Sequence, residues 1–281
     1  MGADLPSEIK PGQSIELLKE LHILTRDGKM NQDSRRKLKQ VYHLYHFIEP
    51  LLQDLQKNSK QINLVDHGAG KSYLGFLIYD LFFKPQAIEG KVYGIETRPE
   101  LIEKSKALAE RLNFKNMEFL KLSVAESATS KALPEAVEIV TALHACDTAT
   151  DDAIHFALAK KAKHMVLVPC CQAEVASVLR QNKAKLLSNP LSELFRFPIH
   201  TREFGSHLTN VLRVLELTAA GYDVTVTELV GFEHSMKNEL IVATQHNNPD
   251  KNHQVRQAKQ RIDEILTEFH LHSLDQRFHL P

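Results

Sequence analysis

The sequence predicts an α/β fold built around a doubly wound sheet of seven strands, mostly parallel, with a C-terminal antiparallel hairpin. Five short apolar runs alternate with helical segments between residues 62 and 169. Strands that alternate with helices in this way form parallel sheets with helices on both faces. Two further apolar runs, 222–230 and 239–245, are joined by a short turn and indicate a hairpin at one edge of the sheet.

The composition is that of a globular protein with balanced charge. The 281 residues are 43% hydrophobic and 25% charged, with 35 Lys+Arg and 35 Asp+Glu. This excludes a disordered or fibrous protein, and one that coats nucleic acid by charge alone. No apolar run approaches the roughly 20 residues that cross a bilayer, and the N-terminal residues lack a secretory pattern. Three cysteines give no disulfide framework, so we expect a cytoplasmic location and no membrane partner.

The elements follow one another in three parts. Residues 1–60 are predicted to be an N-terminal helical extension, because apolar residues recur at helical spacing and are interrupted only by Pro50. Residues 246–281 are predicted to be a C-terminal helical tail, a polar appendage on the surface. The domain between them, 61–245, holds the hairpin and the five strands predicted at 62–66, 91–96, 117–122, 137–143 and 164–169.

The most informative motif lies at residues 65–72, where a strand ends in an acidic residue and a Gly-x-Gly turn leads into a helix. A phosphate-binding P-loop is excluded because its first glycine would fall on Val65, inside the strand. A dinucleotide fingerprint is weakened because its third glycine would fall on Tyr73. Gly68 and Gly70 let the backbone approach a ligand, and the helix start offers free N–H groups. A tight structural turn is the alternative interpretation.

This arrangement resembles motif I of class I S-adenosylmethionine (SAM) methyltransferases, which have a Rossmann-like fold. The resemblance implies that Glu96, at the end of the next strand, holds the ribose hydroxyls of SAM. It also implies that Ser123 and Val124 lie near the adenine, although the family often has an acidic residue followed by an aliphatic one there. The residues that the resemblance assigns to cofactor binding are Asp66, His67, Gly68, Ala69, Gly70, Lys71, Tyr73, Glu96, Thr97, Ser123, Val124 and Leu143.

Two later segments narrow the resemblance to one methyltransferase-domain family, which includes a tRNA 2′-O-methyltransferase. Residues 142–151 are similar to its H-x-C-G-x-x-T-D element, and residues 169–172 to its C-C-H element. Asp147 stands where the first element has glycine, and Gln172 where the second has histidine. The resemblance covers roughly residues 35–245. It does not identify the substrate, because members of this family have diverse or unassigned targets. The matching residues are His144, Cys146, Thr150, Asp151, Cys170 and Cys171.

The ends of the first, second, fourth and fifth strands are expected to converge, because ligands of open α/β sheets bind outside the carboxyl ends of the strands. Methyl transfer is an in-line displacement at an already activated carbon, so the protein mainly aligns the acceptor and handles its proton. His144 and Asp147 are the candidate catalytic residues, because imidazole and carboxylate groups accept protons. A hydrogen-bonded structural histidine is the alternative for His144.

The cysteines after the fourth and fifth strands have two interpretations. Enzymes that methylate cytosine C5 use cysteines at these places, one of them as a covalent nucleophile. Tight packing of small apolar side chains beneath the cofactor is favoured here, because Cys146 has no neighbouring proline. Adjacent Cys170 and Cys171 do not easily both reach one tetrahedral ion, so we expect no metal site.

Two locally basic segments indicate the substrate. Residues 26–40 hold six basic and two acidic residues, among them Arg35, Arg36 and Lys37, and residues 180–213 are also rich in arginine and lysine. Two basic segments that flank one cleft favour a phosphate backbone, and solvated helix faces are the alternative. The sequence therefore predicts a SAM-dependent methyltransferase that acts on RNA. The rivals are a methyltransferase for a small molecule or protein, and a non-catalytic SAM-binding interaction module.

Overall fold

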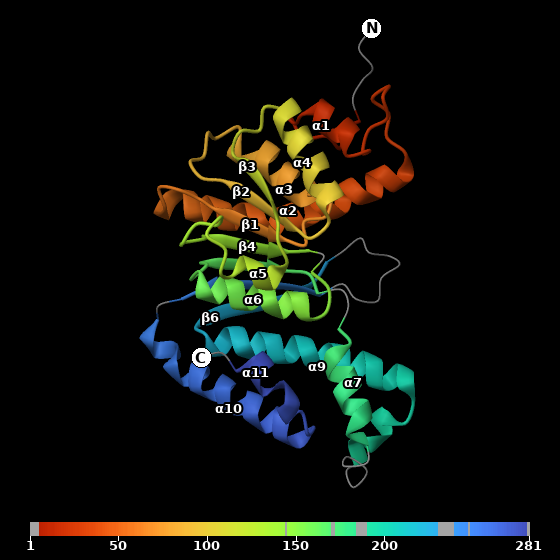
Figure 1. The fold of residues 1–281 in the computed structure, drawn as a ribbon, viewed down its shortest axis with the longest axis vertical. Helices are drawn as coiled ribbons and strands as arrows, with labels where there is room; N and C mark the ends of the chain where they lie inside the picture. Colours follow the sequence, from red (N-terminus) through yellow and green to blue (C-terminus); the bar gives the residue numbers. More distant parts are fainter. Residues whose placement is uncertain are drawn as a thin grey trace.

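The fold is described from a computed structural model, which covers residues 6–143, 145–169, 172–183, 190–229, 239–246 and 248–279. A seven-stranded sheet runs through the molecule in the order β3-β2-β1-β4-β5-β7-β6 (Figure 1). Neighbouring strands are parallel except around β7, which is antiparallel to both β5 and β6. The predicted α/β sheet with its C-terminal hairpin is therefore confirmed. The strands are β1 (Leu64–His67), β2 (Val92–Glu96), β3 (Met117–Lys121), β4 (Ile139–Ala142), β5 (His164–Leu167), β6 (Tyr222–Glu228) and β7 (Glu239–Gln245).

Helices cover both faces of the sheet because its central strands are apolar on both sides. Every residue of β1, β2, β4 and β5 is buried, and most of these residues are apolar. Leu64 and Ile139 face one core layer and Val65 and Val140 face the other, following the two-residue period of a strand.

The first layer holds the N-terminal helices and those that follow β1 and β2. These are α1 (Ile15–Glu20), α2 (Gln32–Asn58), α3 (Tyr73–Ile78), its continuation as the π-helix η1 (Tyr79–Phe83) and α4 (Pro99–Arg111). The second layer holds α5 (Val124–Ser127), α6 (Thr148–Ala159) and the C-terminal part of α9 (Pro198–Ala219). The N-terminal helices pack on the sheet through a stripe of α2 that includes Leu44, Ile48 and Leu52.

The C-terminal tail forms a third layer instead of a surface appendage. Helix α10 (Asn252–Glu268) lies along α9 (Figure 1) and buries Ala258, Ile262 and Leu266, which recur every four residues. The chain then turns back and buries Leu271 and Phe278 in the same cluster. The appendage prediction was wrong because the tail's apolar residues are few, yet they share one helix face. The remaining elements are α7 (Glu174–Gln181), η2 (Pro190–Phe195), η3 (Pro249–Lys251), η4 (His272–Leu274) and α11 (Asp275–Phe278).

Among the described residues, no helix is both long and apolar enough to cross a membrane.

Candidate functional site

A cavity of about 450 Å³ opens at the carboxyl ends of β1, β2, β3 and β4. The strand order reverses at β1, whose neighbours are β2 and β4, and ligands of doubly wound sheets bind at such a reversal. Six of the residues assigned to cofactor binding line the cavity: Gly68, Gly70, Glu96, Thr97, Ser123 and Val124. The other lining residues are Ile95, Arg98, Leu122, Ala125, Ala145, Cys146, Ala149 and Asp152.

The glycine turn forms one wall of the cavity and is tied to the neighbouring strand. Gly68 and Gly70 have φ angles of +66° and +58°, the left-handed region that glycine adopts at little cost. The Ala69 N–H donates to the Ile95 carbonyl at 3.0 Å, and the Gly70 N–H donates to Glu96 Oε2 at 2.9 Å. The turn therefore has the conformation expected of a backbone cradle for a ligand, held on the end of β2.

Glu96 is a buried carboxylate surrounded by donors of its own loop. Its Oε1 accepts from the N–H groups of Thr97 at 2.9 Å and Arg98 at 3.1 Å, and from Arg98 Nε at 3.0 Å. Arg98 Nη2 donates to Oε2 at 3.0 Å. Burial alone would raise the pKa of Glu96, but the hydrogen bonds and charge of Arg98 outweigh it and lower the pKa to about 2. Glu96 is thus an ionised acceptor at the mouth of the cavity, and Arg98 covers it.

Asp66 and His67 lie beneath the glycine turn and do not line the cavity. Asp66 accepts a hydrogen bond from Thr141 Oγ1 at 2.7 Å, and its burial raises its pKa to about 7. His67 Nε2 lies 2.9 Å from Ser127 Oγ, and burial lowers the pKa of the ring to about 3. These two residues therefore support the turn from below.

The structure places the remaining assigned residues apart from this cavity. Lys71 and Tyr73 line a separate cavity of about 380 Å³ between α4 and the segment after α1. Leu143 is half-buried and packs against the core. His144, Cys170 and Cys171 lie outside the described residues. No group of three or more possible metal-ligating side chains occurs in the described part of the chain.

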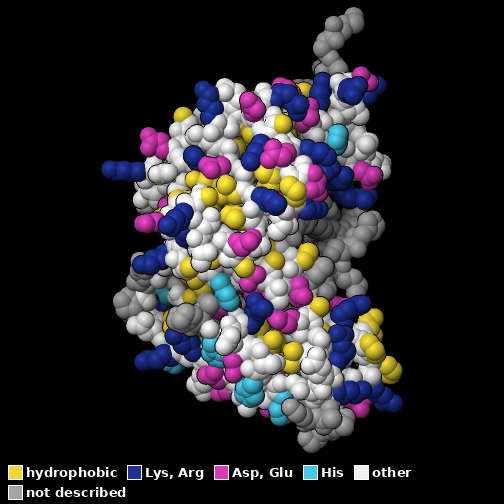
Figure 2. All heavy atoms as spheres, viewed as in Figure 1, with side chains coloured by type: hydrophobic (Ala, Val, Ile, Leu, Met, Phe, Trp, Pro, Cys, Tyr) yellow, Lys and Arg dark blue, Asp and Glu magenta, His cyan; other side chains and the backbone are white. Residues whose placement is uncertain are grey.

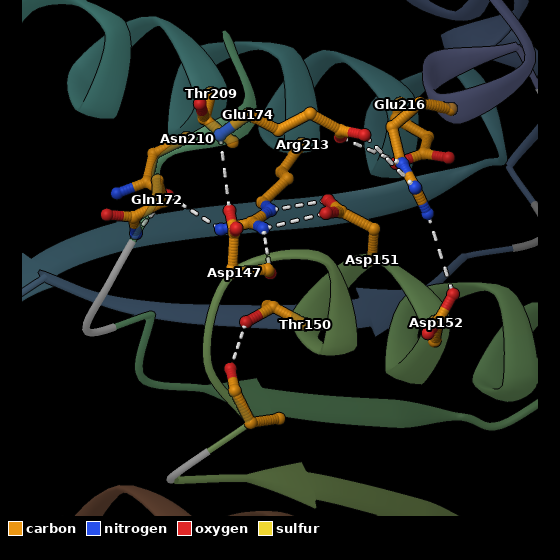
Figure 3. A network of polar contacts seen from close by, with 12 residues as sticks. Asp147, Thr150, Asp151, Asp152, Gln172, Glu174, Thr209, Asn210, Arg213 and Glu216 are labelled. Atoms are coloured by element: carbon orange, nitrogen blue, oxygen red, sulfur yellow. Dashed lines mark hydrogen bonds and ion pairs between the residues drawn. The ribbon is translucent and has the colours of Figure 1, made fainter. Parts of the chain in front are cut away.

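The turn after β4 is held in a conformation that favours glycine. Asp147 has φ +53° and ψ −125°, and its Oδ1 accepts from the N–H of Ala173 at 2.9 Å and of Glu174 at 3.4 Å (Figure 3). This carboxylate therefore caps the N-terminus of α7. The two departures from the family motifs share one network, because Gln172 and the Asp147 backbone are joined through Asn210 and Arg213.

Replacing Asp147 separates the backbone strain from the helix cap. We expect Asp147→Ala to lose the cap, worth about 1 kcal/mol, while keeping the strained φ angle. Asp147→Gly loses the same cap but relieves about 1–3 kcal/mol of strain, so it is expected to be the more stable variant. Urea unfolding of both variants beside the wild type measures the difference. Equal stability of the two variants would contradict the strain assigned to this turn.

The basic segments lie on the same side of the molecule as the carboxyl ends of the parallel strands. Figure 2 shows Lys and Arg side chains over the N-terminal part of α2 and again near α7 and the start of α9, with hydrophobic side chains among the latter. Arg35 pairs with Glu8 and Arg36 lies near Asp33, and all four remain largely exposed. Phe197 is exposed, whereas Phe195 and Phe204 pack in the third core cluster.

Arg213 corrects the prediction for the second basic segment. Its side chain is completely buried, so it cannot contact a phosphate backbone. Arg180, Arg196 and Arg202 are the exposed arginines of this segment's described residues, and Arg196 and Arg202 pair with Glu193 and Glu203. Sequence reasoning missed the burial of Arg213, and it also missed Arg98 and Asp152 as lining residues.

Comparisons with known proteins give a family match and several similar solved structures. One similar solved structure is a magnesium protoporphyrin IX methyltransferase from Synechocystis PCC 6803 with bound SAH, at 13% identity over 82% of this chain and 94% of that chain, with a TM-score of 0.46. A fibrillarin from Aeropyrum pernix with bound SAM is 13% identical over 66% of this chain and 67% of that chain, with a TM-score of 0.40. An rRNA methylase from Streptococcus thermophilus is 11% identical over 66% of this chain and 88% of that chain, with a TM-score of 0.39. No curated protein matches the chain. A family model described as a methyltransferase domain matches residues 36–178, about half of the chain. The chain therefore belongs to this methyltransferase-domain family.

Proposed function

We propose that the protein is a SAM-dependent methyltransferase that acts on RNA. The observation that carries the proposal is the cavity at the strand reversal, with the glycine turn on one side and an ionised carboxylate at its mouth. The family match supports methyl transfer, and SAM would supply a methyl group already activated on a sulfonium sulfur. The residues therefore have to hold the donor and present the acceptor.

The lining residues fit such a donor by their chemistry. Glu96 would accept hydrogen bonds from the ribose hydroxyls, as carboxylates at the end of this strand do in nucleotide-binding sheets. Its oxygens already accept from Thr97, Arg98 and Gly70, so the exposed Arg98 side chain has to swing away first. Val124 adds an apolar wall near the far end, where a planar base would lie.

The acceptor side of the cavity is formed by the turn after β4. We propose that His144 and Asp147 position the acceptor or remove its proton. The contacts of Asp147 with the N-terminus of α7 support a role in placing the turn. Ala145 and Cys146 bring this turn into the cavity wall. Aligning the acceptor with the methyl group is the main contribution that a protein makes to such a displacement.

RNA is favoured as the acceptor by the two basic segments. The N-terminal part of α2, which carries the exposed residues 35–37, and the start of α9, which follows Arg196, lie on the side of the molecule where the parallel strands end (Figure 1). Basic groups on both sides of a cleft fit a phosphate backbone. The exposed ring of Phe197, with the Arg196 guanidinium 5.6 Å from its centre, could stack on an unpaired base.

The first experiment is a calorimetric titration with S-adenosylhomocysteine (SAH), with ATP and NAD as controls. Selective SAH binding is expected, followed by transfer of labelled methyl from SAM into an RNA pool. Labelling of protein or metabolite pools alone would favour a methyltransferase that acts on a protein or a small molecule. SAH binding without labelling of any pool would favour a non-catalytic module, and no SAH binding by folded protein would overturn the proposal.

A charge-neutralised variant tests the RNA partner. Alanine at Arg35, Arg36 and Lys37 is expected to weaken RNA binding and to lower the slope of log K against log salt by about 0.7 per lost single-strand contact. SAH affinity should not change. The matched control places alanine at three exposed basic residues of α10, namely Arg256, Lys259 and Arg261. Equal weakening by both triple variants would contradict a specific RNA surface at α2.

A further inference from the structure

Arg213 is a fully buried cation, and its hydrogen-bond partners are polar atoms of helix α6, of its own helix α9 and of the turn before α6. Its side chain has no exposed surface. Nε and Nη2 donate to the two carboxylate oxygens of Asp151 at 2.6 and 2.9 Å (Figure 3). A buried arginine is costly unless it is paired and hydrogen-bonded in this way. Its place in the core is therefore fixed by these partners.

The same guanidinium reaches the turn that forms the cavity wall. Nη2 donates to the Asp147 carbonyl at 2.8 Å, directly after Ala145 and Cys146, which line the cavity. Asp147 is also the residue with the strained φ angle. The contact holds this peptide in the one orientation in which its carbonyl points to α9 and its side chain points to α7.

A second branch of the network reaches the loop after β5. Arg213 Nη1 donates to Asn210 Oδ1 at 3.2 Å, and Gln172 Nε2 donates to the same oxygen at 3.1 Å. Ser206 Oγ donates to Gln172 Oε1 at 2.6 Å, and Asn210 Nδ2 contacts Glu239 at the start of β7. One helix, α9, thus holds the turns after β4 and β5 and the start of β7 together.

We infer that Arg213 is a positioning residue for methyl transfer. It sets the turn after β4, and through Asn210 the loop after β5, so that the acceptor side of the cavity keeps one geometry. This inference rests on the proposed function. Arg213 touches neither donor nor acceptor, so its loss changes the alignment of the acceptor and leaves binding of the donor intact.

The test compares wild type with Arg213→Lys, which keeps the charge but cannot reach Asp151 and Asp147 together. The matched control is Thr209→Val, since Thr209 is buried on the same helix and its hydroxyl donates to the Gly205 carbonyl of α9 at 2.7 Å. Three quantities are measured: SAH affinity by calorimetry, turnover of labelled SAM with total RNA, and hydrogen exchange of the Ala173 amide. The Ala173 amide reports the network because it donates to Asp147.

We expect Arg213→Lys to lower kcat by about 10- to 100-fold, as small misplacements of reacting groups do, with SAH affinity unchanged. The Ala173 amide should exchange faster, and Thr209→Val should match the wild type in all three. An unchanged kcat, or a loss of SAH affinity equal to the loss of kcat, would overturn the inference.

Two further arms keep the test decisive. If Arg213→Lys does not fold, Arg213→Gln with Asp151→Asn keeps amide hydrogen bonds without leaving a buried charge, and the same outcomes apply. A wild type that binds no SAH contradicts the proposed function. In that case Ala173 exchange still tests the network, and exchange as slow in the variant as in the wild type overturns the role of Arg213.

Discussion

Asp151→Leu is expected to lower the free energy of unfolding by about 3–5 kcal/mol, because it leaves the Arg213 guanidinium buried without its counter-charge. Both side chains are almost completely inaccessible, so water cannot replace the lost partner. Urea unfolding followed by circular dichroism measures the change. We attribute the expected loss of stability to the broken ion pair and not to the presence of an apolar side chain at position 151.

The double variant Asp151→Leu with Arg213→Met separates these two causes. Replacing a whole buried pair by apolar side chains of similar size is often neutral, so the double variant should recover most of the stability. Lys163→Met is the control, since Lys163 and Asp54 form a half-exposed pair at 2.8 Å that is worth at most about 1 kcal/mol. A single variant that costs no more than this control would contradict the burial of an uncompensated charge.

Glu96→Ala is expected to weaken SAH binding by about 1–3 kcal/mol, or roughly 5- to 150-fold, through the loss of hydrogen bonds to an ionised acceptor. Calorimetric titration measures the affinity. Glu100→Ala is the matched control, because Glu100 is exposed in the first turn of α4 and does not line the cavity.

The effect of Arg98→Met on SAH affinity distinguishes whether Glu96 or Arg98 contacts the ligand. Arg98 occupies the Glu96 carboxylate in the structure, so its removal frees that acceptor and should leave SAH affinity unchanged or higher. A loss as large as that of Glu96→Ala would show that Arg98, rather than Glu96, contacts the ligand. Unchanged binding by Glu96→Ala itself would contradict the ribose assignment.

The sequence predicted the parts of the fold that depend on local pattern. Buried parallel strands are apolar runs, and a glycine turn after an acidic strand end has a recognisable spacing, so the sheet and the position of Gly68, Gly70 and Glu96 could be deduced. In the structure these three residues line one cavity, and their assignment to cofactor binding stays a prediction.

The sequence did not predict Arg213, because a charged residue in a basic segment is normally solvated. Its position on α9 held a signal. The buried stripe of that helix includes Leu208, Leu212 and Leu217, and Arg213 falls within it. Its counter-ion, Asp151, lies 62 positions away in the chain, so only the tertiary structure brings the two together.

The place of β7 within the sheet has a consequence for synthesis on the ribosome. β7 is the last strand to be made, yet it lies between β5 and β6. A nascent chain that has completed β5 therefore carries an open strand edge until residue 245 has emerged. Open edges of apolar strands promote pairing with other chains. The interval between the fifth and the last strand is thus the stage at which this protein depends most on protection from aggregation.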